Sequence, residues 1–357
     1  MRVISVVGAR PQFIKAAPVC KALRQSHEEI LVHSGQHYDY AMSDVFFEQL
    51  GIPKPDFNLA VGSGSHGRQT GEMLGMLEEL FLEKAPDVVL VYGDTNTTLA
   101  AGISAAKAGI PVAHVEAGLR SFNKSMPEEV NRVLVDHVSE LLLCPTDAAV
   151  ANLAAEGIVD GVELVGDVML DTARFFSERS GSTDALERFG VREGEYFLAT
   201  VHRAATSDSA QRLESIVRAF SRLDRPVLWA VHPRTAKNIE AFGLGEILER
   251  ADHVRTVPPT SYIDTVALLR GAAGLLTDSG GMQKEAYFFE VPCVTLRDET
   301  EWVETVELGW NRLAGTDEDA IVAAASDLPR PSSHPDVYGH GHAADAIVAA
   351  LEARFGS

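Results

Sequence analysis

The chain has 357 residues, 46% of them hydrophobic, and a formal net charge of −20. This length predicts two domains of ordinary size, each with its own core. The negative charge argues against nucleic acid or an anionic membrane as a partner. No segment approaches the roughly 20 uninterrupted apolar residues of a membrane-spanning helix. The first residues lead directly into a strand-like run with no signal-peptide pattern. We therefore expect a cytoplasmic protein with no membrane partner.

The three cysteines, Cys20, Cys144 and Cys293, are far apart and lie in apolar surroundings. Their odd number and spacing argue against a disulfide framework or a cysteine zinc site. We interpret them as small buried apolar side chains. The chain has 23 arginines and 8 lysines, which suits either a salt-adapted organism or a GC-rich genome. A chain this acidic must concentrate its few cations wherever it binds an anion.

Strand-like runs alternate with helical patterns in the first half, which predicts βαβ units and a mainly parallel sheet. The expected strands are Arg2–Val7, Ile30–Val32, Val88–Tyr92, Val112–Val115, Ser139–Cys144 and Val162–Val165. The expected helices are Ile14–Arg24, Tyr40–Leu50, Gly71–Lys84, Thr97–Ala108, Glu128–Val138 and Met169–Arg179. We assign residues 1–170 to a first domain. The terminal segment 341–357 could pack back on either half, and we place it with the first domain.

A second series of the same kind occupies residues 171–340. The expected strands are Phe197–Thr200, Val227–Val231 and Leu275–Thr277. The expected helices are Ala210–Leu223, Lys237–Glu249, Ser261–Arg270, Met282–Phe289 and Asp317–Ala325, followed by a terminal helix at Ala343–Phe355. In open α/β sheets, ligands bind outside the carboxyl ends of the strands. Because polar residues follow the strands in both halves, we predict two Rossmann-like domains that face a cleft.

Two strand-to-helix turns have the composition of anion sites. Arg10 and Lys15 flank the start of the first helix, where free N–H groups favour an anion. Ser279, Gly280 and Gly281 precede the helix at Met282–Phe289, and Glu285 lies in a position to accept bonds from ribose hydroxyls. Taken alone, each turn is also compatible with an ordinary βα turn or helix N-cap. Together they fit a diphosphate ligand.

Three acidic residues are candidates for acid–base chemistry. Asp94 and Glu116 come directly after apolar strands, and Glu128 opens a helix after a proline. A carboxylate in a cleft suits a general acid or base. Asp94 is also compatible with a turn residue and Glu128 with a first-turn residue favoured by the helix dipole. Glu116 is the hardest to explain structurally.

Several other patterns are weighed and mostly set aside. Residues 62–67 match a dinucleotide-binding fingerprint, but they follow no substantial first strand, so we expect a loop and no NAD. The histidines show no metal-ligand spacing, so we expect no metal. His202 and His232, each at a strand end beside Arg203 and Arg234, are candidates for phosphate contact.

The chain resembles the non-hydrolysing UDP-N-acetylglucosamine 2-epimerases from the first strand to the terminal helix. The motifs that carry the resemblance are Gly8-Ala9-Arg10-Pro11 with Lys15, Gly93-Asp94-Thr95, His114-Val115-Glu116-Ala117-Gly118-Leu119-Arg120, Pro127-Glu128-Glu129-Val130-Asn131-Arg132 and Asp278-Ser279-Gly280-Gly281-Met282-Gln283-Lys284-Glu285. The resemblance implies a glycosyltransferase-B-like fold, a homodimer, a UDP-sugar substrate, and no cofactor.

The resemblance also implies roles for individual residues. Catalytic roles fall on Asp94, Glu116, Glu128 and His202, the last of which also matches the nucleotide-sugar site with Arg10 and Lys15. Ser279, Gly280, Gly281 and Glu285 match the UDP site, and we add Arg203, His232, Arg234 and Arg297 as substrate-binding candidates. One motif departs from the family, which usually continues His-Arg-x with Glu-Asn, because this chain has Ala205-Thr206 after His202-Arg203-Ala204.

Two features concern specificity and regulation. The segment Arg297–Glu304 looks like the branch that includes epimerases of diacetamido-uronic acid nucleotides, which leaves the sugar substituents open. Gln36, His37, Arg68 and Gln69 resemble parts of an allosteric UDP-N-acetylglucosamine site, although Asp39 stands where those members carry another Gln.

The activity implied is reversible epimerisation at carbon 2 of UDP-N-acetylglucosamine, by elimination and re-addition of UDP through a glycal. Which carboxylate removes the proton and which returns it stays open. The alternatives are the same reaction on a UDP-diacetamido-uronic acid, a UDP-sugar-dependent glycosyltransferase, a hydrolysing epimerase, and a nucleotide-sugar sensor.

Overall fold

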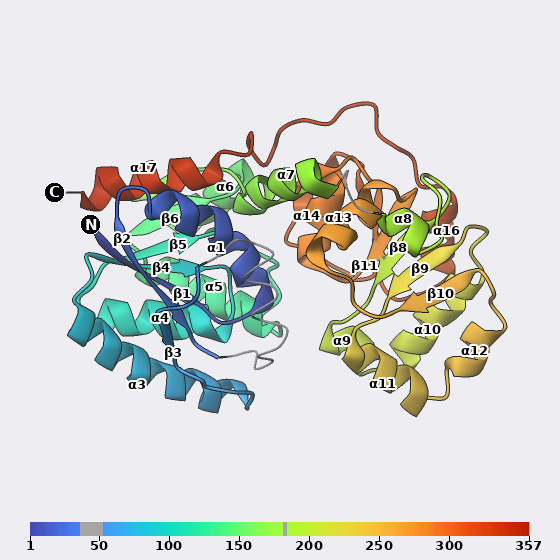
Figure 1. Ribbon diagram of the computed structural model, residues 1–357, viewed down its shortest axis with the longest axis horizontal. Coiled ribbons are helices and arrows are strands. Elements are labelled where there is room, and N and C mark those ends of the chain that lie inside the picture. Colours follow the sequence, from blue (N-terminus) through green and yellow to red (C-terminus); the bar gives the residue numbers. More distant parts are fainter. Residues whose placement is uncertain (36–52, 181–183, 357) are drawn as a thin grey trace. The chain divides into compact units, whose positions relative to one another are not determined.

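A computed structural model describes residues 1–35, 53–180 and 184–356, and its contacts divide the chain into two compact units. The first unit comprises Met1–Thr172 and Asp336–Ser357, and the second comprises Ala173–Pro335. Each is an open parallel sheet with helices on both faces, so the expected α/β class with two Rossmann-like domains is confirmed (Figure 1).

Among the described residues, the sheet of the first unit has seven strands in the order β3-β2-β1-β4-β5-β6-β7. Its strands are β1 (Arg2–Val7), β2 (Glu28–His33), β3 (Phe57–Asn58), β4 (Val88–Tyr92), β5 (Val112–Val115), β6 (Leu141–Cys144) and β7 (Val162–Leu164). Its helices are α1 (Arg10–Leu23), α3 (His66–Lys84), α4 (Asn96–Lys107), α5 (Pro127–Val138), α6 (Asp147–Ala155) and α17 (Ala343–Phe355), and α7 (Val168–Ser180) leads into the second unit.

In its described part, the second unit has a six-stranded sheet in the order β10-β9-β8-β11-β12-β13. Its strands are β8 (Phe197–Thr200), β9 (Val227–Ala230), β10 (Val254–Val257), β11 (Gly274–Thr277), β12 (Cys293–Thr295) and β13 (Asn311–Leu313). Its helices are α8 (Ala185–Arg188), α9 (Ala204–Ser207), α10 (Ala210–Ser221), α11 (Pro233–Ala241), α12 (Gly245–Glu249), α13 (Tyr262–Arg270), α14 (Gly280–Phe288), α15 (Val303–Glu307) and α16 (Glu318–Ser326).

Both sheets reverse their strand order at one point, between β1 and β4 in the first unit and between β8 and β11 in the second. Such a switch point opens a crevice at the carboxyl ends of the two strands, where doubly wound folds bind ligands. Arg10 follows β1 and Asp94 follows β4, whereas His202 follows β8 and Ser279 follows β11. The topology therefore places one group of candidate residues at each switch point.

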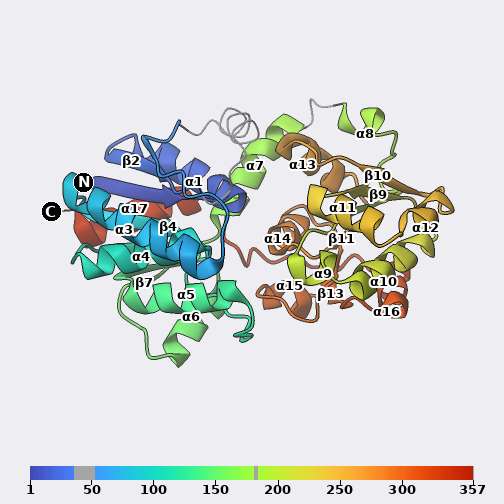
Figure 2. The ribbon, with the colours of Figure 1, turned by 90° about the horizontal axis from the view of Figure 1, so that it is seen from below.

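The central strands β4, β6 and β11 are apolar along their whole length because helices bury both of their faces. In β8, Phe197 and Ala199 pack in one cluster with Leu213 of α10, while Leu198 packs in another with Leu268 of α13. In the first unit, Figures 1 and 2 show α3 beside α4, and Figure 1 shows α1 and α17 on the other side of the sheet.

The terminal helix α17 packs on the first unit, which confirms one of the two placements considered for it. It contacts α1 and β6. The Asp171 carboxylate accepts bonds from the backbone N–H groups of Ala343 (3.1 Å) and Ala344 (2.8 Å) at its start. Because the first N–H groups of a helix lack partners within it, Asp171 fixes where α17 begins.

Two sequence predictions need correction, and one lies outside the described residues. The single helix expected at Lys237–Glu249 is two helices, α11 and α12, because Gly243 adopts a left-handed φ of +70° that ends the first. The helix expected from Met282 begins at Gly280, so the glycines form its first turn. The helix expected at Tyr40–Leu50 falls in the part of the chain that the structure does not describe.

The three cysteines are free and buried, as expected, and burial raises the pKa of Cys144 and of Cys293 to about 12. The loop expected at residues 62–67 is shorter, because residues 62–65 precede α3 and the helix already begins at His66. None of the helices that the structure describes has both the length and the apolar character needed to cross a bilayer.

Candidate active site

The turn after β1 is organised by a buried amide. Gln12 accepts at Oε1 from the backbone N–H groups of Gly8 (2.8 Å) and Ala9 (3.0 Å). It donates from Nε2 to the carbonyl of Tyr92 (2.9 Å), the last residue of β4. Gln12 therefore ties the ends of the two switch-point strands together. Of Arg10, the structure describes only the backbone, at the first residue of α1.

Lys15 and Glu116 form an ion pair in which the residues are only 8% and 7% exposed. Lys15 comes from α1 and Glu116 directly follows β5. Glu116 has a φ of +70°, a left-handed conformation that non-glycine residues rarely adopt. Such strain gathers at functional sites. Gly93 (φ +61°) leaves space for the pair, since a Cβ there would lie 2.9 Å from Lys15 Nζ.

Asp94 is held by helix α5. Arg132 donates to Asp94 Oδ2 from both Nε (3.1 Å) and Nη2, and Asn131 donates to the Asp94 carbonyl (2.9 Å). Both guanidinium bonds use Oδ2, and Oδ1 accepts no hydrogen bond from the residues that the structure describes. The carboxylate is therefore fixed in orientation while one oxygen stays available for a ligand proton.

Glu129, which the sequence analysis did not single out, supports the same arrangement. It accepts a bond from Arg132 (2.9 Å) and others from the backbone N–H groups of Ser121 and Phe122 (2.9 Å each). Glu128, its neighbour, is only partly buried in the first turn of α5, and no contact in the described structure joins it to Asp94 or Glu116. The i, i+3 spacing of Glu129 and Arg132 was the available sequence signal.

In the second unit, Asp278 organises the turn after β8. Its carboxylate is fully buried and accepts from the backbone N–H groups of His202 (3.1 Å) and Arg203 (3.0 Å). The His202 Nδ1 atom lies 3.5 Å from Asp278 Oδ1. The rings of His202 and His232 lie 6.1 Å apart between centroids. The two histidines expected at phosphate therefore lie side by side.

The N-terminus of α14 is enclosed by the segment after β12. Ser279 caps the helix through a bond from the Met282 N–H (3.4 Å). A Cβ at Gly280 would lie 2.4 Å from Glu301 Oε1, so a larger residue here would force the Glu301 side chain to shift. The structure thus brings Gly280 against Glu301, with Ser279 before it as the N-cap and Gly281 as the next residue of the helix.

Glu301 also gathers two cations. Arg297 donates to it from Nη2 (3.0 Å), and Arg203 Nη2 lies 3.7 Å away. Arg297 is 8% exposed, and its Nη1 is buried with no acceptor among the described residues. An unpaired buried donor is costly, so this nitrogen is suited to an oxygen of a bound anion.

The two other candidates of the second unit, Glu285 and Arg234, differ in burial and in their partners. Glu285 is buried and accepts a bond from the Tyr262 hydroxyl (2.8 Å). Arg234 is half exposed, and its nearest acidic partner is Asp208, with Nε 3.7 Å from the carboxylate. No contact in the described structure joins Arg234 to Ser279 or to Arg297.

The candidates for an allosteric site are only partly described. Gln36 and His37 lie outside the described residues. Arg68 is exposed and pairs with Glu72 (2.8 Å) on the same helix. Gln69 is buried, accepts from Asn96 (2.8 Å) and donates to the Gly62 carbonyl (2.9 Å). The Arg68 side chain is therefore exposed to solvent, whereas the neighbouring Gln69 side chain is buried.

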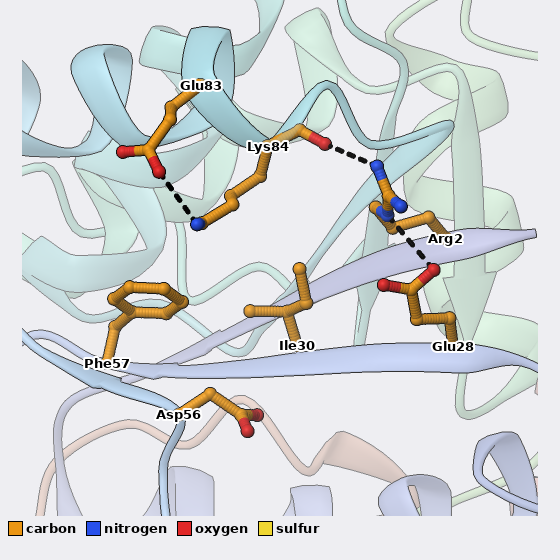
Figure 3. Close-up of a pocket in the computed structure, with 7 residues that line it drawn as sticks. All are labelled: Arg2, Glu28, Ile30, Asp56, Phe57, Glu83 and Lys84. Carbon is orange, nitrogen blue, oxygen red and sulfur yellow. Dashed lines mark hydrogen bonds and ion pairs between the residues drawn. The ribbon is translucent and has the colours of Figure 1, made fainter.

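One pocket of about 530 Å³ lies away from these residues (Figure 3). Arg2 and Glu28, which line it, are the first residues of β1 and β2, and Lys84 is the last of α3. It therefore lies at the amino ends of the strands, opposite to Asp94 and Glu116. Two ion pairs form within its lining, Arg2 with Glu28 (3.1 Å) and Lys84 with Glu83 (2.7 Å).

Comparison with known proteins gives a consistent result. A family model described as UDP-N-acetylglucosamine 2-epimerase matches residues 21–352. A Methanococcus maripaludis protein named UDP-N-acetylglucosamine 2-epimerase homolog is 48% identical over 355 residues, 98% of this chain and 99% of that protein. The UDP-2,3-diacetamido-2,3-dideoxy-D-glucuronate 2-epimerase of Pseudomonas aeruginosa is 47% identical over 358 residues, 98% of each.

The solved structures agree. The crystal structure of Methanocaldococcus jannaschii UDP-GlcNAc 2-epimerase in complex with UDP-GlcNAc and UDP matches with a TM-score of 0.92 at 39% identity, covering 99% of this chain and 100% of that one. This confirms the glycosyltransferase-B-like fold. The chain belongs to the UDP-N-acetylglucosamine 2-epimerase family.

Proposed function

We propose that the protein interconverts UDP-N-acetylglucosamine and UDP-N-acetylmannosamine by inverting carbon 2 of the sugar. The observation that carries this proposal is the pair of carboxylates at the ends of β4 and β5. Asp94, at the switch point of the first sheet, is oriented by Arg132, and Glu116, at the end of the neighbouring strand β5, by Lys15. Two fixed acidic groups are what a proton exchange on both faces of one carbon requires.

The reaction begins by elimination, because carbon 2 has no adjacent carbonyl that would make its proton acidic. The bond between the anomeric carbon and the UDP oxygen breaks, a carboxylate takes the proton of carbon 2, and a double bond forms between the two carbons. UDP leaves as the anion. Reprotonation on the opposite face and re-addition of UDP complete the epimerisation without net consumption of any reagent.

The second unit provides the groups for the departing UDP. The α14 N-terminus at Ser279-Gly280-Gly281 offers backbone N–H groups, and the buried Arg297 Nη1 adds a charged donor. His202 and His232 stand at the neighbouring strand ends. Donors placed where negative charge develops stabilise the transition state. In this proposal Arg10 and Lys15 hold the nucleotide sugar from the first unit.

The test is to incubate the purified protein with UDP-N-acetylglucosamine alone in deuterated water and to follow the sugar by proton NMR. The expected result is UDP-N-acetylmannosamine with deuterium at carbon 2. The variant Asp94→Asn serves as the control, with a large loss of exchange and retained UDP binding. Epimerisation with no solvent label would contradict the mechanism.

The same experiment separates the rival functions. A glycosyltransferase would leave the nucleotide sugar unchanged until an acceptor is added. A hydrolysing epimerase would accumulate free UDP and N-acetylmannosamine. A sensor would bind the nucleotide sugar without exchanging its proton, and Asp94→Asn would leave its output intact.

A second candidate substrate is a UDP-diacetamido-uronic acid. It is favoured by the 47% identical relative that is named for such a substrate. The two guanidinium groups gathered by Glu301, those of Arg203 and Arg297, are also compatible with an anionic sugar. Parallel assays with both nucleotide sugars decide between them, since the preferred substrate has the higher kcat/KM.

The resemblance to the family further supports a cytoplasmic homodimer, which we include in the proposal. Sedimentation of the full chain at assay concentrations, with and without UDP, tests the oligomeric state. A species with the mass of one chain throughout would contradict it.

A further inference from the structure

His114, a fully buried residue of β5, bonds on both sides of its ring. Its Nδ1 lies 2.7 Å from Asp136 Oδ1 on α5, and its Nε2 lies 2.7 Å from the Gly93 carbonyl oxygen. A carbonyl oxygen only accepts hydrogen bonds, so Nε2 carries a proton. Whether Nδ1 also carries a proton then depends on whether Asp136 is ionised.

Asp136 is arranged as an ionised carboxylate. Besides His114, it faces the N–H of Gly118 (3.1 Å) and the Arg120 guanidinium (2.7 Å), both of which donate to Oδ2. Burial alone would raise the pKa of Asp136, but the bond to His114 and the charge of Arg120 hold it below its ordinary value. An ionised Asp136 has no proton to give, so Nδ1 must donate.

We infer that His114 is a positioning residue, a buried imidazolium that ties the Gly93 carbonyl to Asp136 and fixes the turn that carries Asp94. This inference rests on the proposed function, in which Asp94 is catalytic. Gly93 and Asp94 share the peptide unit that His114 holds.

The remaining bonds from α5 converge on the same turn. Asn131 holds the Asp94 carbonyl and Arg132 its carboxylate. With Asp136 acting through His114, one helix fixes the peptide before Asp94, the side chain and the peptide after it. Burying charged groups costs free energy. A neutral side chain would suffice for packing, so the charged ring is explained by the geometry it imposes at the site.

Two substitutions separate the two bonds of the ring. The amide of His114→Asn reaches the place of Nδ1, so this variant keeps the bond to Asp136 and loses the bond to Gly93. The amide of His114→Gln reaches the place of Nε2 and does the reverse. Both remove the charge, and both are expected to lower stability against urea to a similar extent.

The expected difference lies in catalysis. Because misplacement of a catalytic group by about 1 Å costs roughly 100-fold, kcat of His114→Asn should fall about 100-fold, and that of His114→Gln less than about 10-fold. KM and UDP affinity, measured by calorimetry, should stay within about 3-fold of the wild type. Equal losses of kcat in the two variants would overturn the positioning role.

NMR of the wild-type protein labelled with ¹⁵N at histidine tests the charge independently of whether the variants fold. The His114 ring, assigned by its absence in a variant, should show a proton on both nitrogens at neutral pH. One proton only would overturn the inference. The deuterium-exchange assay on the wild type decides the proposed function separately, because an inactive protein can still show the charged ring.

Discussion

Lys15 and Glu116 form a buried ion pair although 101 positions of the chain separate them. The pair joins the first turns of α1 to the end of β5, on either side of the turn after β4. Gly93 occupies that turn and leaves the space in which the two side chains meet. The Lys15–Glu116 ion pair thus connects α1, the helix after β1, to the end of β5 across the turn after β4.

Lys15→Met should abolish most activity and lower stability. Removing one partner of a buried pair leaves an uncompensated charge, which costs about 3–5 kcal/mol in the free energy of unfolding. Urea unfolding and the epimerase assay measure the two effects. Lys107→Met, at an exposed position in the last turn of α4, is the matched control and should change neither measurably. An equally stable, fully active Lys15→Met would show that the pair is dispensable.

Gly93→Ala should impair activity beyond its backbone cost. The left-handed φ of +61° disfavours alanine, and the new Cβ would also lie 2.9 Å from Lys15 Nζ. Gly109→Ala separates the two effects, because Gly109 has a similar φ of +72° but no atom within 4 Å of the added Cβ. Both should lose about 1 kcal/mol of stability, while only Gly93→Ala should lose activity, by about 10-fold or more. Equal activities in Gly93→Ala and Gly109→Ala would show that the space left by Gly93 for Lys15 and Glu116 does not matter for activity.

Asp136→Asn should lower stability at neutral pH, by about 3 kcal/mol for a broken buried ion pair. The pKa of Asp136 is lower in the folded protein than its ordinary 3.8, because the bonds to His114 and Arg120 outweigh burial. Its stabilising contribution is therefore complete above the unfolded pKa and is lost as pH falls through the folded pKa. The difference in the free energy of unfolding between the variant and the wild type should shrink below about pH 4. Urea unfolding at a series of pH values measures this difference.

Glu156→Gln provides the comparison for this acid dependence. Glu156 also pairs with Arg120 (2.7 Å), but its side chain is 28% exposed. The bond from Arg120 lowers its pKa from 4.5. Because water partly screens the Glu156 side chain, this variant should lose less free energy of unfolding than Asp136→Asn. If the difference in the free energy of unfolding between Asp136→Asn and the wild type stayed constant into the acid range, it would argue against an ionised Asp136.

Much of the fold follows from local patterns, because both faces of the central strands β4, β6 and β11 are buried and these runs are accordingly apolar. The strand ends predicted from those runs carry Asp94, Glu116, His202 and Ser279, where the structure has them. The break at Gly243 was missed because apolar spacing continues across it, while its left-handed φ ends α11.

The network behind the carboxylates could not be derived in the same way. Its members, Glu129, Asn131, Arg132 and Asp136, all lie on α5, and their partners come from other strands and loops. Helical spacing predicts that these four side chains lie near one another on α5. It does not predict that they contact the turn after β4. His114 is hidden within an apolar strand, and only the tertiary structure shows that its ring bridges α5 and the turn after β4.

Glu285→Gln should weaken UDP binding if this carboxylate accepts bonds from ribose hydroxyls. Glu285 is buried and already accepts one bond from Tyr262 (2.8 Å). A hydrogen bond to a charged group contributes about 1.5–3 kcal/mol, so the Kd for UDP should rise about 10-fold or more. Tyr262→Phe keeps the charge but removes one bond that orients it, so a smaller rise is expected. The exposed Glu290→Gln, just beyond the same helix, should bind UDP as the wild type does. Calorimetry with UDP measures all three, and unchanged binding in Glu285→Gln would remove Glu285 from the nucleotide site.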